Sequence, residues 1–246
     1  MQLVILLLSD IAVIHDYPDG ISLGVAGSQG VSMVAETVTI HQTSSECQWF
    51  TAVVEASFIL HCDSRGPVKL AVGFPFQGFG WGQERTRFAP ESLATRMKLS
   101  VTADGQEVDF DCKGMPLDTT KWFACWGMGF TPGETRRVIV KYTVPWSYRE
   151  HNFRYPKPVG DKHGSYSYSG GFTYIVSTGA TWAGTIGDAL IRVELPSDCA
   201  KEISVSPEGY ETSKKGASMW ITWHFSDWEP DSSSNIRLGI RTQKEY

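Results

Sequence analysis

The sequence lacks an excess of positive charge. Its 22 lysine and arginine residues are outnumbered by 27 aspartate and glutamate residues, which gives a formal net charge of −5 at pH 7. Proteins that bind nucleic acids usually neutralise phosphates with clustered basic residues. The charge balance therefore excludes a general nucleic-acid-binding function.

Motifs of catalysis and metal binding are also missing. The sequence contains no glycine-rich phosphate-binding motif, no G-x-S-x-G nucleophile motif, and no pair of cysteines or histidines at metal-ligand spacing. His41 and His61 occupy outward positions of two expected strands, where a metal pair and two separate solvent-facing side chains are the alternatives. We therefore predict no metal, no cofactor and no catalytic residue.

No apolar run reaches the roughly 18 residues that a transmembrane helix requires, so no such helix is expected. The chain does begin with an apolar segment, Leu3 to Leu8, followed closely by Ile11 to Ile14. A secretory signal would carry a positive charge before this segment, and none is present. Residues 1–19 are therefore interpreted either as a truncated signal peptide or as a first strand.

Cysteine is scarce and odd in number, with five residues and no C-x-x-C pair. Cys112 and Cys125 flank a turn-like segment, 115–119, and expected strands lie on both sides of it. In a simple hairpin the two cysteines would face each other within reach of a disulfide. A Cys112–Cys125 disulfide and two buried thiols are the two alternatives, and no partner can be assigned to Cys47, Cys62 or Cys199.

What the sequence does contain is an alternation of apolar and polar residues, with a period of two residues. Val54, Ala56 and Phe58 alternate with polar neighbours, and about seven such segments precede residue 146. Alternation with glycine, aspartate or proline turns is typical of half-buried strands, and Asp104-Gly105 is a strong hairpin signal. The pattern predicts an all-β protein with an immunoglobulin-like sandwich over residues 20–146.

Composition changes after this point. Residues 147–171 are rich in tyrosine, serine and glycine, and we interpret them as a loop that opens the second part of the chain. Alternation resumes at Phe172 and continues in five segments, so residues 147–246 are predicted to form a second, smaller β-sandwich-like domain. The only helix expected is a short one over residues 91–97.

Four segments carry a resemblance to a known family. They are an opening segment at 30–40 that continues at 72–76, a central strand at 130–145, a small-residue motif at 174–188, and Asp227-Trp228-Glu229-Pro230-Asp231 before residues 235–238 near the end. In this order they resemble the bacterial domain of unknown function 4424 family along nearly the whole chain. Its members usually carry a signal peptide, so the resemblance implies an exported, extracytoplasmic bacterial protein, but it supplies no activity.

Aromatic residues in glycine-rich and serine-rich segments are the main functional lead. Phe79 and Trp81 lie in one such segment, and Tyr166 and Tyr168 lie in another. Rings displayed on loops stack on sugars or on partner side chains, although they also serve as packing residues. We predict a non-catalytic exported or cell-envelope module that binds an envelope protein or a glycan, with an exported hydrolase of cell-wall polymers or glycans as the alternative.

Overall fold

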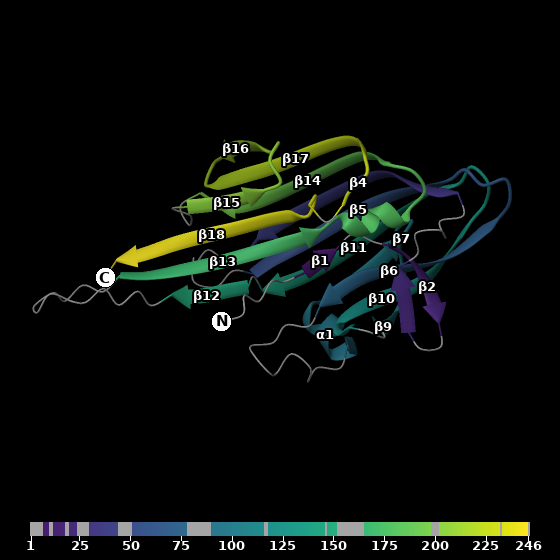
Figure 1. The fold of residues 1–246 in the computed structure, drawn as a ribbon, viewed down its shortest axis with the longest axis horizontal. Coiled ribbons are helices and arrows are strands. Elements are labelled where there is room, and N and C mark those ends of the chain that lie inside the picture. The colour runs from purple at the N-terminus through teal and green to yellow at the C-terminus, as the bar shows by residue number, and fades with distance from the viewer. Residues whose placement is uncertain are drawn as a thin grey trace, which may run out of the picture.

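A computed structural model of the chain describes residues 7–9, 12–17, 20–23, 30–43, 51–77, 90–115, 118–145, 147–151, 165–197, 202–231 and 233–245. These residues form two β-sheets packed face to face, with little helix (Figure 1). The helical elements among them are α1 (Pro90–Arg96) and the 3-10 turn η2 (Ser177–Thr181). The all-β prediction is confirmed, and α1 matches the expected short helix.

Within the described residues, sheet A has ten strands, and its main path runs β15-β18-β13-β1-β6-β10-β9. Strand β12 pairs with β13, while β2 pairs with both β3 and β6. The strands are β1 (Leu7–Ser9), β2 (Ala12–Tyr17), β3 (Gly20–Leu23), β6 (Val68–Gln77), β9 (Asp111–Met115), β10 (Asp118–Phe130), β12 (Ser147–His151), β13 (Ser165–Ile175), β15 (Glu202–Ser206) and β18 (Ile236–Glu245).

Sheet B has eight strands in the same described part of the chain, in the order β16-β17-β14-β4-β5-β11-β7-β8. Its long central strands alternate between buried and exposed side chains, as their sequences predict. The strands are β4 (Val31–Gln42), β5 (Thr51–Cys62), β7 (Ser100–Ala103), β8 (Gln106–Glu107), β11 (Thr135–Pro145), β14 (Ile186–Pro196), β16 (Glu211–Lys215) and β17 (Ser218–Trp228).

One hydrophobic core lies between the sheets and draws residues from both ends of the chain, from Val31 to Leu238. Its largest fully buried side chains include three aromatic rings from sheet B, Trp223, Tyr142 and Phe58. Burying such rings is the main favourable contribution to folding, at about 25 cal/mol for each Å² of apolar surface removed from water. The shared core therefore holds the two sheets together.

The predicted boundary near residue 146 does not divide the sheets. In sheet B, β4 from the first block runs parallel to β14 from the second, with Val38 opposite Ile191 (Figure 1). In sheet A, β1 pairs with β6 and with β13. Alternation shows which face of a strand is buried but not which strand lies beside it, so the sequence suggested two sandwiches where the strands form one pair of sheets.

The segments near the N-terminus also join sheet A. Ala12 pairs with Gly73 of β6, and Leu7 pairs with Thr173 of β13. The structure thus places two described stretches of residues 1–19 in strands. Signal-peptide cleavage stays a separate prediction.

Two local predictions can be compared directly. The Asp104-Gly105 hairpin is confirmed, since Ala103 pairs with Gln106 and both turn residues have positive φ angles of 51° and 80°. Positive φ at both central residues is what a type I′ turn requires. The loop prediction for 147–171 was wrong in part, because it contains β12 and the first seven residues of β13, and the sequence reasoning also missed β16.

Of the two alternatives for Cys112 and Cys125, a disulfide or two thiols, the structure has both residues as thiols. Cys112 lies opposite Ala124 and Cys125 lies opposite Asp111, so the two sulfur atoms lie on opposite faces of sheet A. An irregularity between Asp118 and Trp122 shifts the hairpin register by an odd number of residues, and such a shift moves every following side chain to the other face.

Candidate functional site

The four aromatic residues predicted as a binding site do not form one described cluster. Phe79 and Trp81 lie outside the described residues. Tyr166 and Tyr168 belong to β13, where Tyr168 is flanked by Glu150 of β12 and Thr242 of β18. Their backbone is therefore paired within sheet A and does not form the predicted loop, and ligand binding by their rings stays a prediction.

The two histidines considered as a metal pair are also separated. His61 lies opposite Ser32 at one end of β4, whereas His41 lies opposite Val53 near the other end. His61 contacts Thr135 and Asp63, which are side chains at the same end of the sheet. Within the described part of the chain, no group of three or more potential metal ligands is found.

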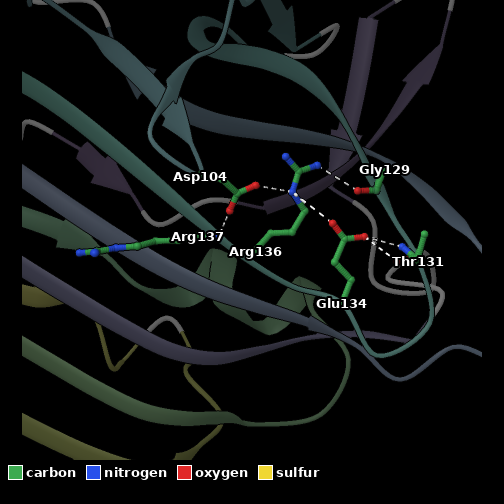
Figure 2. Close-up of polar contacts among 6 residues, drawn as sticks. All are labelled: Asp104, Gly129, Thr131, Glu134, Arg136 and Arg137. Carbon is green, nitrogen blue, oxygen red and sulfur yellow. Dashed lines mark hydrogen bonds and ion pairs between the residues drawn. The ribbon is translucent and has the colours of Figure 1, made fainter.

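A polar network, here called the hairpin network, joins the β7–β8 hairpin turn to the turn between β10 of sheet A and β11 of sheet B (Figure 2). Asp104, in the β7–β8 turn, accepts a hydrogen bond from Arg136 Nε at 2.7 Å and from the Arg137 backbone N–H at 2.9 Å. Arg136 also donates to the Gly129 carbonyl at 3.0 Å. Glu134 accepts from the backbone N–H and the hydroxyl of Thr131, at 2.6 and 3.0 Å.

The electrostatics of this hairpin network favour its charged form. Slight burial opposes ionisation of Asp104, but the hydrogen bonds from Arg137 and Arg136 and the charge of Arg136 lower its pKa overall. The hydrogen bonds from Thr131 likewise lower the pKa of Glu134. Because its groups bind one another across the two turns, the network serves to fix these turns.

A second cluster lies on the solvent face of sheet B, where three neighbouring strands place His41, Glu194 and Trp220 side by side. We call these three residues the outer row. His41 Nδ1 lies 2.6 Å from Glu194 Oε2, and the imidazole meets the Trp220 ring edge-on with centroids 5.7 Å apart. Hydrogen bonds from Ser218 and His41 lower the pKa of Glu194. The outer row thus combines an ionised carboxylate, an imidazole and an indole.

The same face continues as a polar surface. Lys141 Nζ contacts Glu55 Oε2 at 2.9 Å, and His224 Nε2 contacts Asp188 Oδ1 at 2.6 Å. Side chains of the outer row are accessible, since His41 is 44% and Glu194 is 28% exposed. Alternation in the sequence could place His41 and Glu194 outward. Only the parallel pairing of β4 with β14 brings these two residues together.

A third cluster lies in the core and centres on Glu36, which has no exposed surface. The register of β4 shifts between Met33 and Ala35, and beyond this bulge Glu36 points inward. At Gly187 of β14, an added Cβ would lie 2.6 Å from the Val34 carbonyl oxygen, so glycine permits the close approach of β14 to the bulge. The sequence held a signal for this site, because Glu36 is two residues before the apolar Val38 and therefore lies on the same face of the strand.

Only one of the two carboxyl oxygens of Glu36 has a hydrogen-bond partner. The Tyr174 hydroxyl donates to Glu36 Oε1 at 3.1 Å, while Oε2 has no hydrogen-bond partner in the described structure. Burial raises the pKa of Glu36 to about 7, and the Tyr174 hydrogen bond opposes this shift. The buried hydroxyl of Tyr142 also has no partner, and burial together with the charge of Glu36 raises its pKa.

Comparison with known proteins supports the fold. No protein-family model matches the chain, and no curated protein matches its sequence. A solved structure from Legionella pneumophila, described as a candidate nutrient binding protein, aligns with a TM-score of 0.64 at 14% identity, covering 95% of this chain and 71% of that one.

A second similar structure is an M1 zinc metallopeptidase from Deinococcus radiodurans. It aligns with a TM-score of 0.42 at 10% identity, over 88% of this chain and 45% of the peptidase. This chain therefore spans less than half the length of that enzyme, and the likeness is too weak to carry zinc or peptidase chemistry over to it. The Legionella structure shows that the two-sheet architecture occurs in a solved protein.

Proposed function

We propose that the chain is a non-catalytic binding module that works outside the cytoplasm and recognises a glycan through the outer row of sheet B. The observation that carries the proposal is the arrangement of Trp220, Glu194 and His41 on three paired strands. Sites on a rigid sheet hold their side chains more accurately than sites on loops. Such a row offers a ligand a preformed surface.

The chemistry of the outer row suits a hydroxyl-rich ligand. An indole ring is a large apolar surface with a polar edge, and sugar rings present C–H groups on one side and hydroxyls around the rim. The carboxylate of Glu194 accepts hydrogen bonds, and the exposed imidazole of His41 can donate or accept. Together they provide one stacking surface and two polar contacts, the pattern usual for small-molecule sites.

A glycoside hydrolase is less well supported by the described residues. Such an enzyme needs an accessible carboxyl group that stays protonated to act as the acid, beside a second, ionised one. Three accessible carboxylates on this face, Glu194, Glu55 and Asp188, are each paired with a basic side chain. The carboxyl group whose pKa is raised, Glu36, is fully buried and cannot reach a polymer.

The extracytoplasmic location and the relationship to the domain of unknown function 4424 family belong to the same proposal. They are supported by the resemblance of the four segments described above, including the small-residue motif at 174–188, and by the apolar start of the chain. Envelope glycans are abundant in that compartment, which agrees with the choice of ligand.

Binding to an array of bacterial envelope glycans, followed by titration calorimetry on the strongest one, tests the proposal. We expect Trp220→Ala and His41→Ala to weaken binding at least about tenfold, since each removes a central contact. Tyr210→Ala is the matched control, because Tyr210 is an exposed aromatic residue, 38% accessible, outside the outer row. It should bind like the unmodified chain.

Two results would count against the proposal. One is binding to no glycan while an envelope protein is captured, and the other is equal binding by Trp220→Ala. A Trp81→Ala, Tyr168→Ala double variant separates the outer row from the aromatic residues predicted first. If only the double variant loses binding, the site lies with those residues.

A further inference from the structure

Glu36 joins the two sheets through a side-chain hydrogen bond. Its carboxyl group belongs to β4 of sheet B, and the Tyr174 hydroxyl that donates to it belongs to β13 of sheet A. The two residues are 138 positions apart in the chain, and neither side chain is exposed. The hydrogen bond therefore links two layers and two distant segments.

The surroundings of Glu36 leave the carboxyl group short of donors. Among the described core residues, Glu36 is the one with an ionisable carboxyl group or a basic side chain. The strands paired with β4 on either side, β5 and β14, present apolar side chains to the core. The titratable groups near it are the phenols of Tyr142 and Tyr174, and Cys62 lies further along at the end of β5. No basic residue of the described core can neutralise a charge there.

Buried polar atoms are nearly always paired, so the exceptions point to a role. Here two exceptions, Glu36 Oε2 and the Tyr142 hydroxyl, occur in the same part of the core, close enough for the charge of one to act on the other. A neutral carboxyl group tolerates such a site much better than a carboxylate does.

We propose that Glu36 is a proton-controlled tie between the two sheets: protonated, it lets β4 and β13 pack undisturbed, and on losing the proton it leaves an unmatched charge at Oε2 that disturbs this packing, although the Tyr174 hydrogen bond itself becomes stronger. The neutral acid keeps Oε1 as the acceptor for Tyr174 and carries its proton on the other oxygen. On ionisation the proton leaves to solvent, and the remaining charge requires a second donor. Either the Tyr142 hydroxyl or water must move to Oε2, and both movements disturb the packing between sheets.

This inference goes beyond the proposed ligand binding, because the tie lies inside the sandwich and its test uses no ligand. The burial that raises the pKa of Glu36 to about 7 places the transition near neutral pH. Any change of pH across that range should therefore alter the contact between β4 and β13.

Hydrogen exchange of the backbone amides in β4 and β13, expressed as protection factors from about pH 5 to about pH 9, tests the tie. We expect protection to fall with a midpoint near pH 7 in the unmodified chain and to stay constant in Glu36→Gln, which cannot ionise. Glu55→Gln is the matched control, since Glu55 is an exposed carboxylate on the adjacent strand, and it should behave like the unmodified chain.

Infrared spectroscopy gives a second measurement that does not require Glu36→Gln to fold. The band of a protonated carboxyl group should disappear near neutral pH in the unmodified chain and at a higher pH in Tyr174→Phe, because the tyrosine hydrogen bond stabilises the charged form. Constant protection across the range, or an infrared midpoint that Tyr174→Phe leaves unchanged, would overturn the proposal.

Discussion

Glu36 and Asp104 are carboxyl groups of the same sheet in opposite situations. Asp104 stands at an exposed turn with donors from Arg136 and Arg137 on both oxygens, and its pKa is lowered. Glu36 stands in the core with one tyrosine donor and one unpaired oxygen, and its pKa is raised to about 7. Donors and solvent, rather than residue type, decide which carboxyl group carries a charge.

The difference separates a structural role from a functional candidate. The hairpin network at Asp104 satisfies its groups and can be changed at small cost, because exposed ion pairs contribute at most about 1 kcal/mol. A buried group with an unmet hydrogen bond costs about 1–3 kcal/mol, so its retention in a core needs a reason. A fold can keep such a group only where the apolar burial of the surrounding core outweighs this loss of free energy.

The largest effect is expected from pH itself. With a pKa of about 7 in the folded chain and an ordinary value of 4.5 when unfolded, Glu36 keeps its proton in the folded state after the unfolded state has lost it. Stability should therefore fall as pH rises from about 4.5 to about 7, by on the order of 3 kcal/mol in total. Urea unfolding over this range measures the fall, and a flat curve would contradict it.

Asp104 should show the opposite sign. Its pKa is lowered on folding, so the stability that it contributes is present above the unfolded value of about 3.8 and is lost as pH falls through the folded value. Comparing Glu36→Gln with Asp104→Asn in the same urea series separates the two carboxyl groups.

Gly187→Ala should have the next largest effect. The new Cβ would lie 2.6 Å from the Val34 carbonyl, a backbone atom that cannot move aside freely, so β14 must shift away from the bulge that aims Glu36 inward. We expect a loss of about 1–3 kcal/mol in thermal or urea unfolding. Gly129→Ala is the control, because Gly129 is also a strand glycine and has open space at its Cβ position. Similar losses in both variants would show that strand glycines in general, and not this contact, limit stability.

Two tyrosine variants should differ from each other by a smaller amount. Tyr174→Phe removes the donor to Glu36 and should cost about 1–2 kcal/mol, whereas Tyr142→Phe removes a hydroxyl without a partner and should be neutral or slightly stabilising. Melting temperatures measured near pH 5, where Glu36 is neutral, make the comparison direct. Equal losses would mean that Tyr142 has a partner in solution.

The smallest effect is expected at the hairpin network. Asp104→Asn keeps a residue that tolerates the positive φ angle of 51° and removes the charge, so the loss should be at most about 1 kcal/mol and should shrink in high salt. Asp104→Ala also places alanine at this positive φ angle, which strains the backbone, so this variant should lose more stability than Asp104→Asn. If Asp104→Asn proved as costly as Gly187→Ala, the network would be a larger contributor than exposed ion pairs normally are.

Local patterns predicted local structure well. The Asp104-Gly105 turn, the short helix at α1 and the alternation of β14 all follow from side chains close together in the chain. Prediction failed where distant segments or one extra residue decided the outcome. The irregular register before Trp122 put Cys112 and Cys125 on different faces, and the pairing of β4 with β14 formed the outer row.

The burial of Glu36 could have been predicted from the sequence, because Glu36, Val38 and Ile40 are spaced two residues apart along the strand and so lie on one face of it. What the pattern could not supply was the partner, since Tyr174 comes from the other sheet. Tyr166 and Tyr168 show the reverse case, where a composition typical of loops belongs to a paired strand. Composition describes what a segment tends to do alone, and pairing in a sheet overrides it.

The parallel pairing of β4 with β14 has a consequence for how the chain folds. Partners such as His41 and Glu194 are separated by 153 residues, so the centre of sheet B cannot close until nearly four-fifths of the chain is available. Contacts this distant in sequence slow folding, and until β14 arrives β4 has an unpaired edge. The chain is therefore expected to fold late, as one cooperative unit, after synthesis of its C-terminal segments rather than block by block from the N-terminus.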